Sequence, residues 1–121
     1  MKFLYKKLDG GFVRPIISIE VGHKKQTIKY FGLIDSGADV SLFHSEIGEL
    51  IGLDIESGEK HLIGGITQGE TQAYYLHPVS LYVGGWNFRT EVGFMPTLSK
   101  LGHGLLGQKG FFDLFKSEKF E

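Results

Sequence analysis

A short turn that carries an acidic residue lies between two apolar segments in the first half of the chain. Residues 30–34 form an apolar run, the tetrapeptide Asp35-Ser36-Gly37-Ala38 follows directly, and residues 40–43 are again mainly apolar. A carboxylate between apolar neighbours is costly to bury unless it is paired or functional. The pattern therefore predicts a strand that delivers Asp35 onto a tight turn. Because Asp, Ser and Gly are common turn residues, an ordinary surface turn is the alternative.

Glycine is the compositional outlier, with 18 residues among 121, about twice its average share. Apolar residues recur throughout the chain, so this composition indicates many short strands joined by tight turns. The apolar share of 41% and the charged share of 22% are ordinary for a globular protein. The length suits one domain, and we expect a single domain over residues 1–121.

Alternation of apolar and polar residues predicts strands along most of the chain. A Gly64-Gly65 pair between two such segments is typical of a hairpin, and its polar outward half favours a projecting position. A change of period predicts a short helix at 44–52, with Ser45 as N-cap and Gly52 as its stop, and a helical turn at 108–115. We expect an all-β fold, a closed or nearly closed barrel with one or two short helices. Its strands are predicted at 12–21, 27–34, 53–63, 66–76, 79–83, 86–94 and 105–107.

The totals exclude several classes of protein. A formal net charge of −1 gives little attraction for nucleic acid or for an anionic membrane. The absence of cysteine excludes disulfides and cysteine nucleophiles and fits a reducing compartment. The first residues contain no apolar signal segment, and no apolar run nears the roughly 20 residues of a membrane span. We expect a cytoplasmic protein without nucleic-acid or membrane partners.

Histidine and serine give no strong sign of other chemistry. No two of the five histidines have the helical spacing of a metal site, so we expect neither a metal nor a cofactor. Ser41 and Ser45 lie near His44, but the G-x-S-x-G elbow of serine hydrolases is missing, and polar caps are the simpler interpretation. The histidines are His23, His44, His61, His77 and His103.

Three segments, in this order, resemble the retroviral-type (retropepsin-like) aspartic proteases and their bacterial and archaeal cellular relatives. The most specific is the Asp35-Ser36-Gly37-Ala38 turn between apolar runs. Leu62-Ile63-Gly64-Gly65-Ile66 looks like the flap tip of the retroviral enzymes. Leu105-Leu106-Gly107-Gln108 is similar to the apolar-apolar-Gly element that leads into the C-terminal helix of the family. The resemblance spans residues 16–115.

The resemblance implies a homodimeric aspartic endopeptidase with one Asp35 from each subunit as the catalytic pair. Of two neighbouring carboxyl groups, one takes a proton from water and the other donates one to the peptide carbonyl. Asp-Ser-Gly occurs once in this chain, so the second acid must come from another copy. The resemblance also implies that Ser36 bonds across the two-fold axis. Gly37, Ala38 and Asp39 would contact a peptide or protein substrate.

The predicted hairpin has a role in the same scheme. Peptide hydrolysis needs an extended substrate that is held by main-chain hydrogen bonds and shielded from water. The resemblance implies that Gly64, Gly65 and Ile66 close over the substrate as a flap.

Two departures from the family pattern concern the dimer. Gln108 stands where the retroviral enzymes commonly have arginine, so an ion pair from this position to an acid such as Asp39 would become a neutral contact. The charged end at 116–121 is short for a terminal interface strand. Two alternatives stay open: a catalytically inactive dimerisation or peptide-binding module, and a structural β-barrel in which Asp-Ser-Gly is only a turn.

Overall fold

The computed structural model describes residues 3–7, 13–64, 71–98 and 102–115. They form eight strands, one α-helix and two short 3-10 helices. The strands are β1 (Phe3–Lys7), β2 (Val13–His23), β3 (Gln26–Ile34), β4 (Leu42–His44), β5 (Glu59–Gly64), β6 (Thr71–Val83), β7 (Trp86–Met95) and β8 (Gly104–Leu106). The helices are α1 (Ser45–Leu50), η1 (Ile55–Ser57) and η2 (Phe112–Phe115).

All eight strands belong to one mixed sheet in the order β1-β2-β3-β8-β4-β7-β6-β5. A further antiparallel pairing of β2 with β6 brings the sheet around into a ring, which is not a regular barrel. The pairings β3–β8 and β4–β7 are parallel, while the three long hairpins are antiparallel. The predicted all-β class is confirmed.

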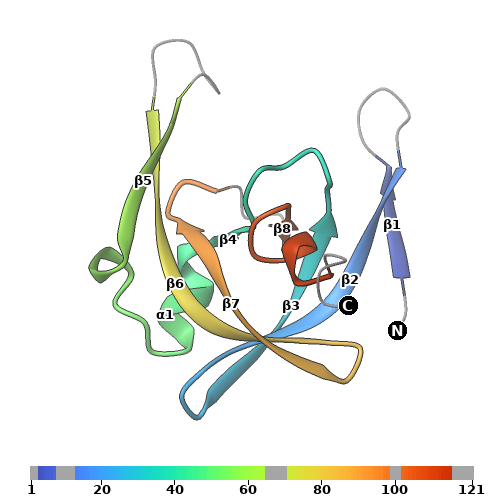
Figure 1. The fold of residues 1–121 in the computed structure, drawn as a ribbon, viewed down its shortest axis with the longest axis horizontal. Coiled ribbons are helices and arrows are strands. Elements are labelled where there is room, and N and C mark those ends of the chain that lie inside the picture. Colours follow the sequence, from blue (N-terminus) through green and yellow to red (C-terminus); the bar gives the residue numbers. More distant parts are fainter. Residues whose placement is uncertain (1–2, 8–12, 65–70, 99–101, 116–121) are drawn as a thin grey trace.

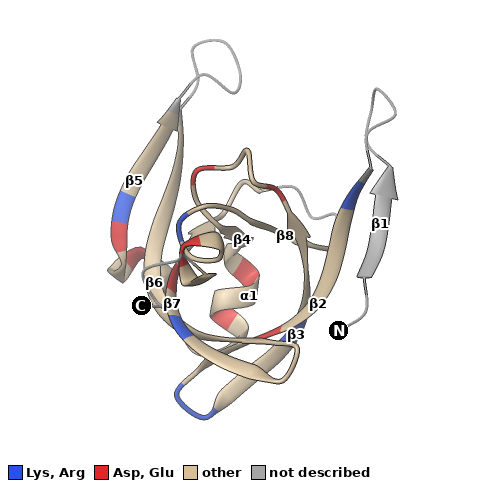
Figure 2. Cartoon of the chain, turned by 45° about the vertical axis from the view of Figure 1, so that its right-hand side comes forward, with Lys and Arg blue, Asp and Glu red and all other residues tan. Residues whose placement is uncertain are grey.

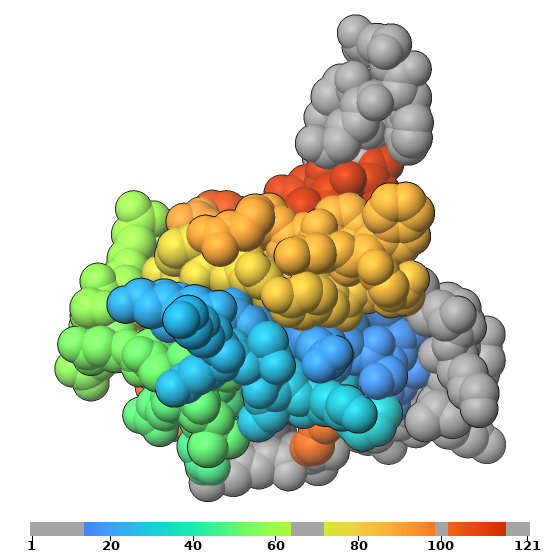
Figure 3. Space-filling model, turned by 90° about the horizontal axis from the view of Figure 1, so that it is seen from below, coloured from blue at the N-terminus to red at the C-terminus, as the bar shows by residue number. Residues whose placement is uncertain are grey.

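Two hairpin arms rise on either side of the turn that follows β3 (Figure 1). One arm is made by β1 with the start of β2, and the other by β5 with the start of β6. On the opposite side of the molecule, β2 and β3 lie against β6 and β7 as one continuous surface (Figure 3). The turn after β3 therefore lies at the mouth between the arms.

The main core fills the ring between β2, β6 and β7. Alternate residues of β2 point inward, because successive side chains of a strand face opposite sides. Phe43 and Phe94 are fully buried, with their rings edge to face at 6.0 Å. A smaller cluster lies between β4 and the β5–β6 arm, made by Leu42, Tyr74, Leu76 and Met95. The main core includes Ile17, Ile19, Val21, Val79, Leu81, Val83, Val92 and Leu106.

Strand β6 runs without a break from Thr71 to Val83, where the sequence predicted two strands around Pro78. Pairing with β5 ends at Leu76, and pairing with β2 begins at Ser80. Pro78, which has no backbone N–H to donate, lies in the gap between these two partners. The predicted strand at 53–63 is also shorter, since η1 precedes β5.

The structure corrects the cap of the predicted helix. Helix α1 begins at Ser45, but its N-cap is His44, whose Nδ1 accepts a hydrogen bond from the Glu46 N–H at 3.0 Å. Gly52 follows the helix with φ of +90°, a conformation that glycine adopts without strain. Strand β1 was not predicted, because its residues show no alternation.

Charged residues of both signs are spread over several elements of the described chain (Figure 2). Among these residues, no helix is both long enough and apolar enough to cross a lipid bilayer.

Candidate active site

Asp35 follows the last residue of β3, at the point where β3 runs parallel to β8. Its backbone N–H donates to the Leu106 carbonyl at 3.0 Å, which extends the ladder by one residue. The Ala38 N–H then donates to the Asp35 carbonyl at 3.0 Å and closes the turn. The predicted delivery of Asp35 from a strand onto a tight turn is what the structure shows.

The segment after β8 supports the turn from behind. The N–H groups of Gln108 and Lys109 donate to the carbonyls of Ala38 and Asp39 at 2.8 and 2.9 Å. The Gly107 N–H donates to the Ser41 hydroxyl at 2.9 Å, and Ser41 is only 1% exposed. Ser41 therefore supports the turn and is not the polar cap that the sequence suggested.

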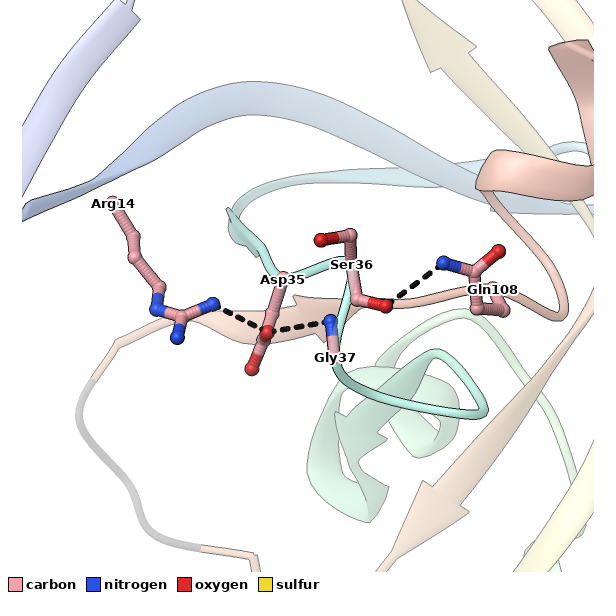
Figure 4. A network of polar contacts seen from close by, with 5 residues as sticks. All are labelled: Arg14, Asp35, Ser36, Gly37 and Gln108. Carbon is pink, nitrogen blue, oxygen red and sulfur yellow. Dashed lines mark hydrogen bonds and ion pairs between the residues drawn. The ribbon is translucent and has the colours of Figure 1, made fainter.

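The side chain of Gln108 makes a hydrogen bond, but to a different residue than the expected acid, Asp39. Its side-chain amide donates to the Ser36 carbonyl at 2.8 Å (Figure 4), not to the carboxylate of Asp39. The amide thus holds the middle of the turn directly, which is a correction to the contact predicted from the sequence.

The Asp35 carboxylate accepts two hydrogen bonds on one oxygen. The Gly37 N–H donates to Oδ1 at 3.0 Å, and Arg14 Nη1 lies 2.6 Å from the same oxygen (Figure 4). The side chains of Arg14 and Asp35 are 38% and 24% exposed. The acid is therefore half-buried and ion-paired, with Oδ2 outside both bonds.

The sequence interpretation missed Arg14, although hairpin register could have found it. The β2–β3 pairing runs from His23–Gln26 to Ile16–Leu33 around the turn at Lys24-Lys25. Continuing it by two residues sets Arg14 opposite Asp35, and opposed residues of antiparallel strands are within side-chain reach.

A cavity of about 440 Å³ opens between the turn and the β5–β6 arm. Its wall is mostly apolar, with one carboxylate and one phenol. Partial burial, and then the nearby carboxylates of Asp39 and Glu59, raise the pKa of Tyr74 above its usual value of 10.0. The ring of His61 stacks on Tyr74 at 5.3 Å on the arm. The lining residues are Ala38, Asp39, Val40, Leu42, Leu62, Ile63 and Tyr74.

The predicted site residues fall into three groups. Asp35, Ser36 and Gly37 form the turn, with Ser36 and Gly37 exposed. Ala38 and Asp39 line the cavity next to it. The backbone of Gly64 ends β5, in register with Thr71, while Gly65 and Ile66 lie outside the described residues.

Three of the described histidines have structural contacts. His44 caps α1, and His77 Nε2 lies 2.7 Å from the Ile55 carbonyl oxygen in the interior. His61 Nε2 lies 2.6 Å from a Glu59 carboxylate oxygen. Over residues 3–7, 13–64, 71–98 and 102–115, no three His, Cys, Asp or Glu side chains gather as metal ligands.

No protein-family model and no curated protein matches this chain in sequence. In structure, it is similar to the EIAV protease in complex with the inhibitor HBY-793, with a TM-score of 0.58, 20% sequence identity, and coverage of 86% of this chain and 90% of that chain. A retropepsin-like aspartic protease from Rickettsia conorii has a TM-score of 0.48 and 20% identity, with coverage of 88% and 79%. The chain therefore has the retropepsin fold, which confirms the fold predicted from the sequence resemblance.

Proposed function

Given the retropepsin fold, we propose that the chain is an aspartic endopeptidase that acts as a homodimer. The observation that carries the proposal is the placement of Asp35, half-buried on a braced turn at the mouth between two hairpin arms. Each chain has one Asp-Ser-Gly turn, so two copies would bring two Asp35 carboxyl groups together across a two-fold axis. Ser36 would bond across that axis.

The proposed reaction uses water as the nucleophile. One Asp35 carboxylate takes a proton from the water as it attacks the peptide carbonyl, and the carboxyl group of the other Asp35 donates a proton to the carbonyl oxygen. The resulting diol then returns a proton to the second Asp35 as the C–N bond breaks, and the amine leaves with the proton that the first Asp35 took from water. The Gly37 N–H, which already binds Oδ1 at 3.0 Å, would keep the carboxylate oriented during this exchange. None of these steps requires a metal or a cofactor.

The cavity beside the turn favours a peptide as the substrate. Its apolar wall would accept an apolar side chain of the substrate, and Asp39 at its edge would bind substrate main-chain N–H groups. Leu62 and Ile63 belong to the β5–β6 arm, so a closing arm would complete the cavity over the bound peptide. Gly64, Gly65 and Ile66 would supply main-chain contacts as the flap tip.

The test is the Asp35→Asn variant, assayed on a mixed-sequence peptide library with cleavage read by mass spectrometry. Wild-type protein should cut internal peptide bonds, and Asp35→Asn should lose at least about a thousandfold in rate, because an amide cannot act as the proton acceptor. Asp54→Asn, at an exposed residue before η1, is the control and should keep wild-type activity. Equal cleavage by Asp35→Asn and wild type would refute the proposal.

One observation favours a second candidate, a non-catalytic dimerisation or peptide-binding module. In the single chain, the Asp35 carboxylate is occupied by Arg14 at 2.6 Å, as it would be in a purely structural ion pair. A module would bind library peptides without cutting them, and Asp35→Asn would leave that binding in place. We also propose, from the sequence, a single domain over residues 1–121 and a cytoplasmic location.

A further inference from the structure

Arg14 and Asp35 face each other as a consequence of the hairpin register. Arg14 lies near the start of β2, on the arm that β2 forms with β1, where it pairs with Lys6. Because β2 and β3 are antiparallel around a tight turn, the register itself brings the guanidinium to the carboxylate. The contact needs no second chain.

This contact conflicts with the proposed chemistry. The Arg14 guanidinium occupies Oδ1 of Asp35 together with the Gly37 N–H, and the proposed reaction needs the Asp35 oxygens for the water and the other Asp35. If both copies kept the contact, one oxygen of each Asp35 would be bound to groups of its own chain and not to the attacking water or to the other Asp35.

Among the described residues, Arg14 is the only cation with a contact to Asp35. Arg14 comes from β2, and the other group on the carboxylate is the Gly37 N–H of the turn itself; the uncharged Gln108 binds the neighbouring Ser36 carbonyl. An ion pair between partly exposed side chains is weak and screened by salt. Assembly can therefore break it by rotating one long side chain.

We propose that Arg14 is a latch, whose guanidinium holds the Asp35 carboxylate in the separated chain and leaves it when two chains assemble. The proposal rests on the proposed function, because it describes how the same site stays inactive until it is paired. In the separated chain Oδ1 of Asp35 is occupied by Arg14, and pairing frees this oxygen for the proposed reaction.

Arginine side-chain NMR tests the latch directly, because the chain has only two arginines, Arg14 and Arg89. Protein labelled with ¹⁵N-arginine gives one Nε–H signal for each, and Arg14→Gln and Arg89→Gln identify them. In dilute samples that sediment as single chains, Asp35→Asn should shift the Arg14 signal and leave that of the exposed Arg89 in place. The matched variant Asp39→Asn should leave both signals in place.

The second part of the experiment tests whether Arg14 leaves Asp35 when the chains pair. In wild-type samples concentrated until sedimentation shows paired chains, the Arg14 signal should leave its single-chain position while the Arg89 signal stays. If the Arg14 signal of single chains kept its position in Asp35→Asn, the latch would be overturned. An unchanged Arg14 signal in paired chains that cut peptides would also overturn the latch, but would leave the proposed function standing. If no concentration gave pairing or cleavage, the proposed function would fail and the latch with it.

Discussion

At the scale of single residues, the pKa of Tyr74 reports on the cavity beside the Asp35 turn. Its phenol is influenced by two carboxylates, Asp39 from the turn and Glu59 from the base of the arm. A negative charge nearby disfavours the phenolate. The titration of this one group therefore depends on how close the turn and the arm are.

We predict that Asp39→Asn lowers the pKa of Tyr74, because the variant removes one of the charges that raise it. Ultraviolet titration of tyrosinate absorbance measures this, with Tyr74→Phe used to assign the transition. Asp54→Asn, which does not contribute to the raised pKa of Tyr74, is the control. An unchanged Tyr74 transition in Asp39→Asn would mean that the two groups are not close in solution.

Tyr30 makes the stability of the core depend on pH in the alkaline range. It is buried against Phe43, with ring centroids 5.2 Å apart. Burial raises its pKa above 10.0, and a backbone hydrogen bond with His44 acts in the opposite direction. The folded chain thus keeps the proton to higher pH than the unfolded chain, so the stabilisation is complete below pH 10 and is lost as pH rises through the raised pKa.

Tyr30→Phe should therefore be less sensitive to alkali than wild type. At pH 8 we expect it to be about 1 kcal/mol less stable, because it loses a hydrogen bond. At pH 11 the difference in free energy of unfolding should shrink or reverse. Urea unfolding at both pH values measures this, and Tyr82→Phe on β6 serves as control. A constant difference between the two pH values would contradict the prediction.

At the scale of elements, β8 and the residues after it determine where the Asp35 turn lies. Gly107 approaches the turn so closely that an added Cβ would lie 2.6 Å from the carbonyl oxygens of both Ala38 and Val40. Those atoms belong to the backbone and cannot rotate away. This close approach explains the glycine in the apolar-apolar-Gly element.

Gly107→Ala should displace the turn and destabilise the fold by about 1–3 kcal/mol, the usual range for overpacking. Thermal unfolding measures the stability, and the peptide assay should show a loss of cleavage at temperatures where the variant is still folded. Gly85→Ala provides the comparison, because Gly85 has φ of +86° but open space around it. It should lose stability through backbone strain alone and keep its activity. Full cleavage by folded Gly107→Ala would show that the turn tolerates the displacement.

Elements with a strong alternation could be predicted from the sequence, and elements fixed by distant partners could not. Strands β2, β3 and β7 lie close to their predicted places because one face of each is buried. Strand β1 has no such alternation and is defined by its pairing with β2. The Asp35 turn was predicted from its own residues. The contact between Arg14 and Asp35 was not, because it depends on the register of β2 and β3. The cavity beside the turn was not predicted either, because it depends on the position of the β5–β6 arm.

At the scale of the whole molecule, the site is an edge of the ring and not an enclosed pocket. The turn that carries Asp35 lies between the two arms (Figure 1), and the cavity beside it is lined by residues of the β5–β6 arm. A second copy could complete the wall on the other side. Activity should accordingly belong to pairs of chains.

Mixing experiments test this dependence. With a tenfold excess of Asp35→Asn chains allowed to exchange, most wild-type chains would sit in mixed pairs, and cleavage should fall roughly tenfold. Excess Asp54→Asn chains should cause no fall. Analytical ultracentrifugation of differently labelled chains would verify exchange, and undiminished cleavage after verified exchange would show that one Asp35 suffices.

The bracing of the turn by distant residues also has a meaning for biosynthesis. Gln108 holds the Ser36 carbonyl from 72 positions further along the chain, and such non-local pairings form late in folding. While the ribosome is still adding the segment that follows β7, the Asp35 turn lacks the hydrogen bonds from Gln108 and Lys109. If the proposed function holds, a nascent chain would therefore be unable to cleave neighbouring nascent chains on the same polysome.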